Sequence, residues 1–196
     1  MAQAPAATSA PAASNTANPA PLGLAGFALT TMVLSAANAQ LIGGSSVQVV
    51  VALALAYGGL AQLLAGMWEF KSGNTFGATA FTSFGAFWLS YAAFVWFFAA
   101  NLKPGDAAGA VGTYLLVWGI FTFYMWIATL KHARPVMIVF LLLWITFLVL
   151  AVGEYQANKS ITQIGGYIGI LTAIAAWYAS ARTIINEAWG REVLPG

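Results

Sequence analysis

Charged residues occur only in short segments between long apolar runs, and this spacing limits the fold more than any other feature. No Asp, Glu, Lys, Arg or His precedes Glu69. Beyond it, uncharged stretches cover residues 72–102, 107–130, 135–153 and 160–181. Each is about as long as the roughly 20 apolar residues that a helix needs to cross a bilayer. A helix of a soluble protein would carry a charged outer face, and these stretches have none.

The first 68 residues contain two more apolar runs, which meet at Gly43-Gly44-Ser45-Ser46. The chain is therefore predicted to be an all-α integral membrane protein with six transmembrane helices packed as a bundle. The runs are continuous and lack the alternation that is typical of barrel strands. The predicted spans are Pro21–Gln40, Val47–Trp68, Thr75–Ala100, Val111–Leu130, Pro135–Gly153 and Ile161–Ala181.

The ends of the chain differ from this membrane domain, which is predicted to cover residues 18–188. Residues 1–17 are uncharged and rich in Ala, Pro and Ser, without the basic start and apolar stretch of a signal peptide. We expect a disordered tail there and a short C-terminal tail at 189–196. The chain has no cysteine, which excludes disulfides and thiolate metal sites. No cofactor is expected, and seven scattered cations form no patch for nucleic acid.

The loop charges predict the orientation of the bundle. If both termini are cytoplasmic, the inside loops and tail carry five of the seven cations, and only Lys103 and Lys159 lie outside. This distribution follows the positive-inside rule. The basic turn Lys131-His132-Ala133-Arg134 is its strongest marker, so His132 is interpreted as a loop residue. The compact loops favour a multi-pass protein of the plasma (inner) membrane.

The sequence offers little material for catalysis. One His, no Cys and five acidic residues near the predicted helix ends form no triad, carboxylate pair or metal cluster. No ionisable side chain lies near the midplane of a predicted span, although such residues usually mark proton relays and ion coupling. The chain is therefore predicted not to be an enzyme, and a pore or carrier lined by neutral groups remains.

Neutral polar side chains are present inside the spans. Thr31 shares one face of the first span with Phe27, Leu34 and Asn38. Gln62 lies well inside the second span, where an unpartnered amide costs about 1–3 kcal/mol. It serves either as a clamp between helices or as a contact for solute. Thr79 belongs to the third span, which is the richest in hydroxyl groups.

Two helix starts could hold an anion without a buried cation. Unpaired N–H groups give a helix N-terminus about half a positive charge. Pro21 is suited to the first turn of one helix, and Asn74 is a good cap for another. Both starts lie on the predicted cytoplasmic side. We expect them to form an electropositive entrance to the pore with Asn18 and Lys71.

Several motifs resemble one known family when they are taken together. They are Asn18-Pro19-Ala20-Pro21-Leu22-Gly23-Leu24, residues 66–81 (GMWEFKSGNTFGATAF), residues 118–122 (WGIFT) and the tail from Asn186 to Pro195. In this order they resemble the acetate uptake transporter family, the succinate–acetate permeases. The resemblance implies a six-helix subunit around its own central pore, a ring of six subunits, and passage of acetate and sometimes succinate.

The resemblance also implies a pore constriction built from Phe, Tyr and Leu. The Phe falls on Phe27 and the Leu on Leu143, but Phe84 stands where the family has Tyr. The implied neck is therefore entirely apolar and should favour acetate over succinate. Channel-like and proton-linked passage both remain open. The alternatives are transport of ammonia or ammonium, and a membrane scaffold that transports nothing.

Overall fold

The computed structural model describes residues 16–196. Residues 1–15 of the predicted tail 1–17 therefore lie outside the described residues. Helices make up its regular structure, and no strand occurs among the described residues. The elements are α1 (Ala20–Asn38), η1 (Gly44–Ser46), α2 (Val47–Leu55), η2 (Ala56–Ala61), α3 (Gln62–Lys71), α4 (Thr75–Ala93), η3 (Phe94–Phe98), η4 (Ala99–Asn101), α5 (Pro104–Thr129), α6 (Arg134–Tyr155) and α7 (Lys159–Trp189).

These elements form six helical segments that are long and apolar enough to cross a membrane. The segment Val47–Lys71 joins α2 to α3 through the π-helical turn η2, and Thr75–Asn101 continues α4 through η3 and η4. The other four are α1, α6, α7 and Gly105–Thr129 within α5. The predicted all-α membrane fold with six spans is confirmed.

Two helices extend further than hydropathy predicted. α5 begins at Pro104 instead of Val111, because proline is well suited to a first helical turn and Asp106 complements the positive end of the helix. α7 continues beyond Ala181 to Trp189 and ends where Gly190 adopts a left-handed conformation with φ of 61°. Both added segments carry charged residues, Asp106 in the first and Arg182 and Glu187 in the second, so a search for uncharged apolar stretches misses them.

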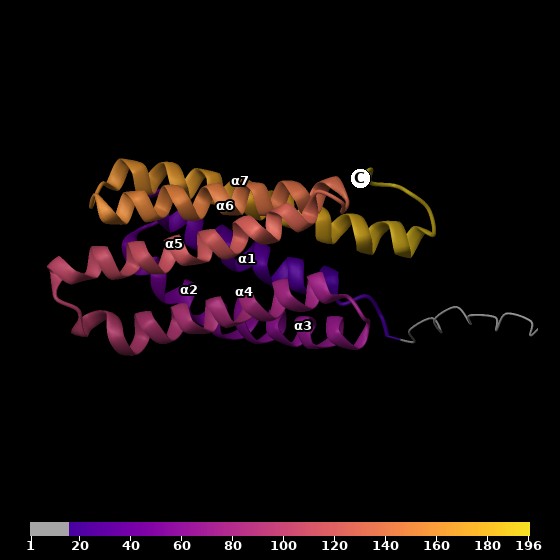
Figure 1. Ribbon diagram of the computed structural model, residues 1–196, viewed down its shortest axis with the longest axis horizontal. Coiled ribbons are helices and arrows are strands. Elements are labelled where there is room, and N and C mark those ends of the chain that lie inside the picture. Colours follow the sequence, from indigo (N-terminus) through magenta and orange to yellow (C-terminus); the bar gives the residue numbers. More distant parts are fainter. Residues whose placement is uncertain (1–15) are drawn as a thin grey trace, which may run out of the picture.

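The helices are arranged so that both described ends of the chain lie at the same end of the bundle, as Figure 1 shows. We call this the N/C end and the opposite one the far end. α7 packs along α1 and α6, and α6 packs along α5. The hairpin of α3 and α4 forms the other side of the bundle, and α1 contacts η2 and α3. α1 thus lies between the group of α5, α6 and α7 and the hairpin of α3 and α4. It therefore contributes to the lining of any cavity that they enclose.

Glycines allow α1 to approach its neighbours closely. A Cβ at Gly26 would lie 2.6 Å from the carbonyl oxygen of Tyr57 in η2. On the other side of α1, a Cβ at Gly166 of α7 would meet the backbone of Ala39. Small residues are the usual means of close helix packing in lipid, where no hydrophobic force drives association.

Gly26→Ala is therefore expected to lower the stability of the folded protein by about 1–3 kcal/mol through overpacking. Gly109→Ala in α5 is the matched control, because a Cβ there has no atom within 4 Å. That control should be neutral or stabilising, since alanine favours a helix by up to about 1 kcal/mol. Thermal unfolding in detergent measures both, and equal midpoints would contradict the proposed close contact.

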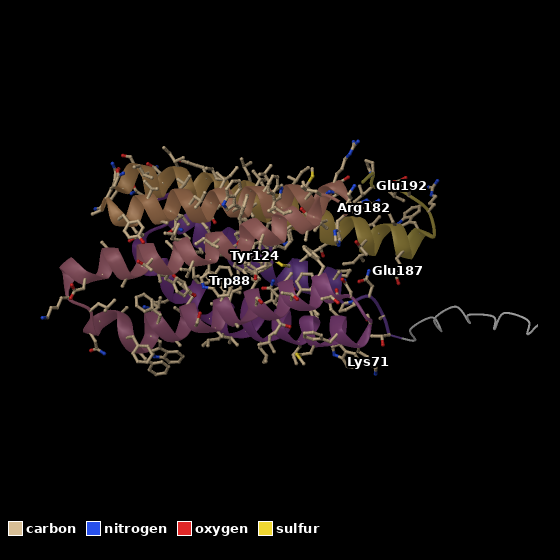
Figure 2. The ribbon with its side chains drawn as sticks, in the orientation of Figure 1. Lys71, Trp88, Tyr124, Arg182, Glu187 and Glu192 are labelled. Carbon is tan, nitrogen blue, oxygen red and sulfur yellow. The ribbon has the colours of Figure 1, made fainter. Side chains whose placement is uncertain are left out.

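The C-terminal residues fold back onto α7 at the N/C end. The Asn186 side chain accepts hydrogen bonds from the backbone N–H groups of Val193 and Leu194 and donates one to the Leu194 carbonyl oxygen. Arg182 and Glu192 lie 3.5 Å apart, and both are labelled at this end in Figure 2. In the same helix, Ser180 donates a hydrogen bond of 2.8 Å to the carbonyl oxygen of Pro21. α7 therefore holds the start of α1 in place.

Candidate functional site

Three side chains from three separate helices meet in the middle of the bundle. Phe27 of α1, Phe84 of α4 and Leu143 of α6 are each buried and line one small cavity of about 20 Å³. We call this cavity the neck. Its full lining is Leu24, Phe27, Gln62, Ala80, Phe81, Phe84, Val139, Phe140 and Leu143. The structure therefore brings together the three predicted constriction residues and Gln62.

Phe84 is the centre of the aromatic packing around the neck. Its ring centroid lies 5.8 Å from that of Phe27, 5.4 Å from Phe121 and 6.0 Å from Phe140. The planes are tilted or edge-to-face, which are the favourable arrangements for aromatic pairs. Phe84 is only 2% exposed. Its ring is thus held by contacts on several sides, and the neck has a firm apolar wall.

Gln62 is the one polar side chain in the lining of the neck. It is 1% exposed, and its Oε1 has no hydrogen-bond partner within residues 16–196. It lies directly after η2, and π-helical turns often occur at functional sites. A buried acceptor without a partner costs about 1–3 kcal/mol. This geometry favours contact with water or solute over the alternative of a clamp between helices.

A larger cavity of about 420 Å³ lies between the neck and the far end. We call it the vestibule. Phe87, one turn beyond Phe84 on α4, lines it, and the Trp118 ring packs against both of these side chains. The Tyr114 hydroxyl, also in the lining, donates to the Phe87 carbonyl oxygen at 3.1 Å and lies 2.7 Å from the Ser90 hydroxyl. An aromatic layer therefore separates the vestibule from the neck.

A third cavity of about 730 Å³ lies among the far-end loops. We call it the mouth. Its lining comes from the end of α1, the loop that follows it, the end of α6 and the start of α7. Asn38 and Glu154 line both the mouth and the vestibule. Mouth, vestibule and neck thus succeed one another from the far end towards the middle of the bundle.

Three of the four residues on the predicted face of α1 line these cavities. Phe27 lines the neck, and Leu34 and Asn38 line the vestibule. Thr31 lies between them in the sequence, buried, and its Oγ1 has no partner among the described residues. Its assignment to the substrate pathway stays a prediction.

The remaining predicted residues lie elsewhere. Asn18 is exposed at the N/C end, and its Oδ1 accepts the backbone N–H of Ala20 at 3.0 Å. Thr79 is half-buried on α4 and belongs to the lining of neither the neck nor the vestibule. The pathway roles of Asn18 and Thr79 likewise stay predictions.

Asn74 caps α4, as predicted, but it also holds a carboxylate. Its Oδ1 accepts the N–H of Gly77 at 3.1 Å, and its Nδ2 donates to Glu69 Oε2 at 2.8 Å. Glu69 is 2% exposed, and a Cβ at Gly77 would lie 2.7 Å from its carboxyl carbon. The positive end of α4 therefore already has an anion of the same chain beside it. Hydropathy ended the predicted span at Trp68, whereas α3 continues to Lys71. The burial of Glu69 beside the start of α4 was therefore not predicted.

Sequence reasoning also missed several aromatic residues of the site. Phe81 and Phe87 flank Phe84 at three-residue spacing on α4, and Phe140 precedes Leu143 by the same spacing on α6. Such spacing places side chains on one helix face, so it was the signal that could have found them. For metal binding, no group of three His, Cys, Asp or Glu side chains within residues 16–196 has suitable geometry.

Comparison with known proteins identifies the family. The GPR1/FUN34/yaaH family matches residues 2–190. The chain belongs to this family. The resemblance inferred from the motifs is thereby confirmed, since relatives in the GPR1/FUN34/yaaH family include named succinate–acetate transporters.

Several relatives of this GPR1/FUN34/yaaH protein are named as transporters. The succinate-acetate/proton symporter SatP of Escherichia coli is 42% identical over 91% of this chain and 94% of its own. Acetate permease A of Emericella nidulans is 41% identical over 91% and 65%. Ammonia transport outward protein 2 of Saccharomyces cerevisiae is 47% identical over 83% and 59%. The solved structure of the bacterial acetate channel SatP superposes with a TM-score of 0.86 at 42% identity, covering 92% of this chain and 99% of that chain.

Proposed function

We propose that this multi-pass membrane protein carries acetate across the bilayer through the neck, in a channel-like or proton-linked manner. The observation that carries the proposal is the meeting of Phe27, Phe84 and Leu143 around one cavity in line with the vestibule. The names of the SatP and acetate permease relatives support the same substrate. The functional evidence points to transport, and we propose no reaction chemistry for this chain.

The size of the neck indicates that passage requires it to widen. A cavity needs about 10–15 Å³ to hold one water, so the neck has room for little more than that. Acetate, with four heavy atoms, does not fit. An apolar constriction also penalises charged solutes, because they must shed water there without gaining a charged partner. The neck therefore favours a small acid, and most of all the neutral acid, over a dicarboxylate.

Acetate flux is accordingly expected to exceed succinate flux by at least about tenfold, since charge and size both oppose the larger acid. Labelled acetate and succinate are measured in parallel with purified protein in liposomes at neutral pH. Empty liposomes correct for leakage of each acid. Equal protein-dependent fluxes would contradict the selectivity assigned to the neck.

The proposal also covers the orientation of the protein, its membrane and its oligomeric state. We propose that the N/C end faces the cytoplasm, because five of the seven cations lie in the helix ends, loop and tail of that end. We further propose the plasma (inner) membrane as its location and a homo-hexamer as its assembly. The family resemblance supports the hexamer, and cross-linking in native membranes tests it.

Ammonia or ammonium is the second candidate substrate. The vestibule carries the rings of Phe87, Tyr91, Phe94 and Tyr114 together with the carboxylate of Glu154, and no cation lines it. Aromatic faces and a carboxylate attract small cations. The name of the yeast relative supports this candidate. In the third candidate, a scaffold without transport, the unpartnered Oε1 of Gln62 would bond to buried water and not to a solute.

One reconstitution separates these candidates. Purified protein in liposomes is tested for acetate and ammonia flux, with and without an imposed pH gradient. Protein-dependent acetate flux is the expected result. If that flux does not depend on the gradient, passage is channel-like, and if the gradient drives accumulation, it is proton-linked. Ammonia flux alone would replace acetate as the substrate, and no flux of either would support the scaffold.

A further inference from the structure

Asn38 and Glu154 lie where the mouth borders the vestibule. Asn38 is the last residue of α1, and Glu154 lies in the last turn of α6. These two residues are common to the linings of both cavities. A solute that moves directly from the mouth to the vestibule therefore passes beside them. We call this pair of side chains the doorway.

The doorway carries a carboxylate without a partner. Glu154 is half-buried, and its carboxylate forms no ion pair or hydrogen bond with the side chains of residues 16–196. Because it borders two cavities, water has access to it. A carboxylate without a partner in the wall of a cavity repels anions more strongly than one in open water, because the apolar protein around it screens its charge less than water does.

Among the described residues, no other group in the lining of the vestibule carries a charge that would neutralise Glu154. Asn38 of α1 is neutral, and so are the phenols of Tyr91 on α4 and Tyr114 on α5 at neutral pH. Lys159, at the start of α7, lines the mouth but not the vestibule. A carboxylate solute therefore meets a cation in the mouth and then a fixed negative charge at the doorway.

We propose that the doorway is a charge filter that determines specificity, with Glu154 excluding dicarboxylates before they reach the neck. A dianion is repelled about twice as strongly as a monoanion, and a neutral acid is not repelled at all. Selection thus occurs twice, by charge at the doorway and by width at the neck. The inference rests on the proposed acetate transport and adds a residue to it.

The test compares the ratio of succinate flux to acetate flux in liposomes at neutral pH. Glu154→Gln keeps the shape and removes the charge, so the ratio is expected to rise roughly tenfold, as for one unit charge at about 10 Å in an effective dielectric of about 20. Asn38→Asp adds a second carboxylate at the doorway and is expected to lower the ratio by a similar factor. Two opposite shifts cannot both come from damage to the fold.

Glu187→Gln is the matched control, because it removes the same charge at the exposed N/C end, where Figure 2 labels Glu187. Its ratio should equal that of the unchanged protein. If acetate flux is normal and neither doorway variant changes the ratio, the filter is overturned while the proposed function stands. If the unchanged protein carries neither acid, the proposed function itself fails. A shift of the same size in Glu187→Gln would also overturn the filter, because net charge would then explain the effect.

Discussion

Leu143→Ala is expected to raise succinate flux on the order of tenfold, with a smaller gain for acetate. Leu143 is 4% exposed and faces Phe27 and Phe84 across a cavity of about 20 Å³. Truncation leaves only a methyl group at this wall, so the neck widens. A few carbon atoms in an apolar pocket change discrimination by about 10- to 200-fold. Liposome fluxes of both acids, each divided by the amount of folded protein, measure the effect.

Leu142→Ala is the matched control for this variant. Leu142 is the adjacent residue of α6, but it lines a groove formed with α7 away from the neck. Both truncations remove the same group, and core truncations of leucine cost about 2–5 kcal/mol where the space stays empty. Leu142→Ala should leave the succinate-to-acetate ratio unchanged. An unchanged ratio in Leu143→Ala as well would remove Leu143 from the constriction.

Gln62→Leu is expected to lower acetate flux about tenfold to a hundredfold while leaving the protein as stable as before or more stable. The amide is the one polar group of the neck, so its loss removes a hydrogen bond of about 1.4–3 kcal/mol to the passing acid or its water. Its Oε1 has no partner in the described part of the chain, so the apolar replacement breaks no hydrogen bond of this oxygen and removes an unsatisfied buried acceptor. Flux and thermal unfolding are measured on the same preparation.

Gln163→Leu is the control, and it is expected to change stability but not flux, the opposite of Gln62→Leu. Gln163 of α7 donates a hydrogen bond of 3.2 Å to the carbonyl oxygen of Ala39, and it lies outside the lining of the neck. Its loss should lower stability by about 0.5–1.5 kcal/mol and leave flux per folded protein unchanged. If Gln62→Leu behaves in this way instead, Gln62 is a clamp between helices.

Much of the fold was predictable from the sequence because the bilayer constrains each helix separately. The charge-free stretches indicated all six spans, and the largest errors in their bounds occurred at the polar ends of α5 and α7. The constriction was predicted differently. Phe27, Phe84 and Leu143 came from a resemblance to a family, and by themselves they are ordinary apolar residues. Glu69 was expected at a helix end, but its burial against the start of α4 depends on how the α3–α4 hairpin closes.

By itself, then, the sequence determined that the chain spans a membrane six times and which family it belongs to. These properties depend on local hydropathy and on short motifs. The tertiary structure alone decided that Gln62 faces the constriction and that Asn38 and Glu154 share a doorway. Asn38 and Glu154 lie far apart in the chain. They line the same two cavities because α1 and α6 both pack against α7, and no local pattern records that arrangement.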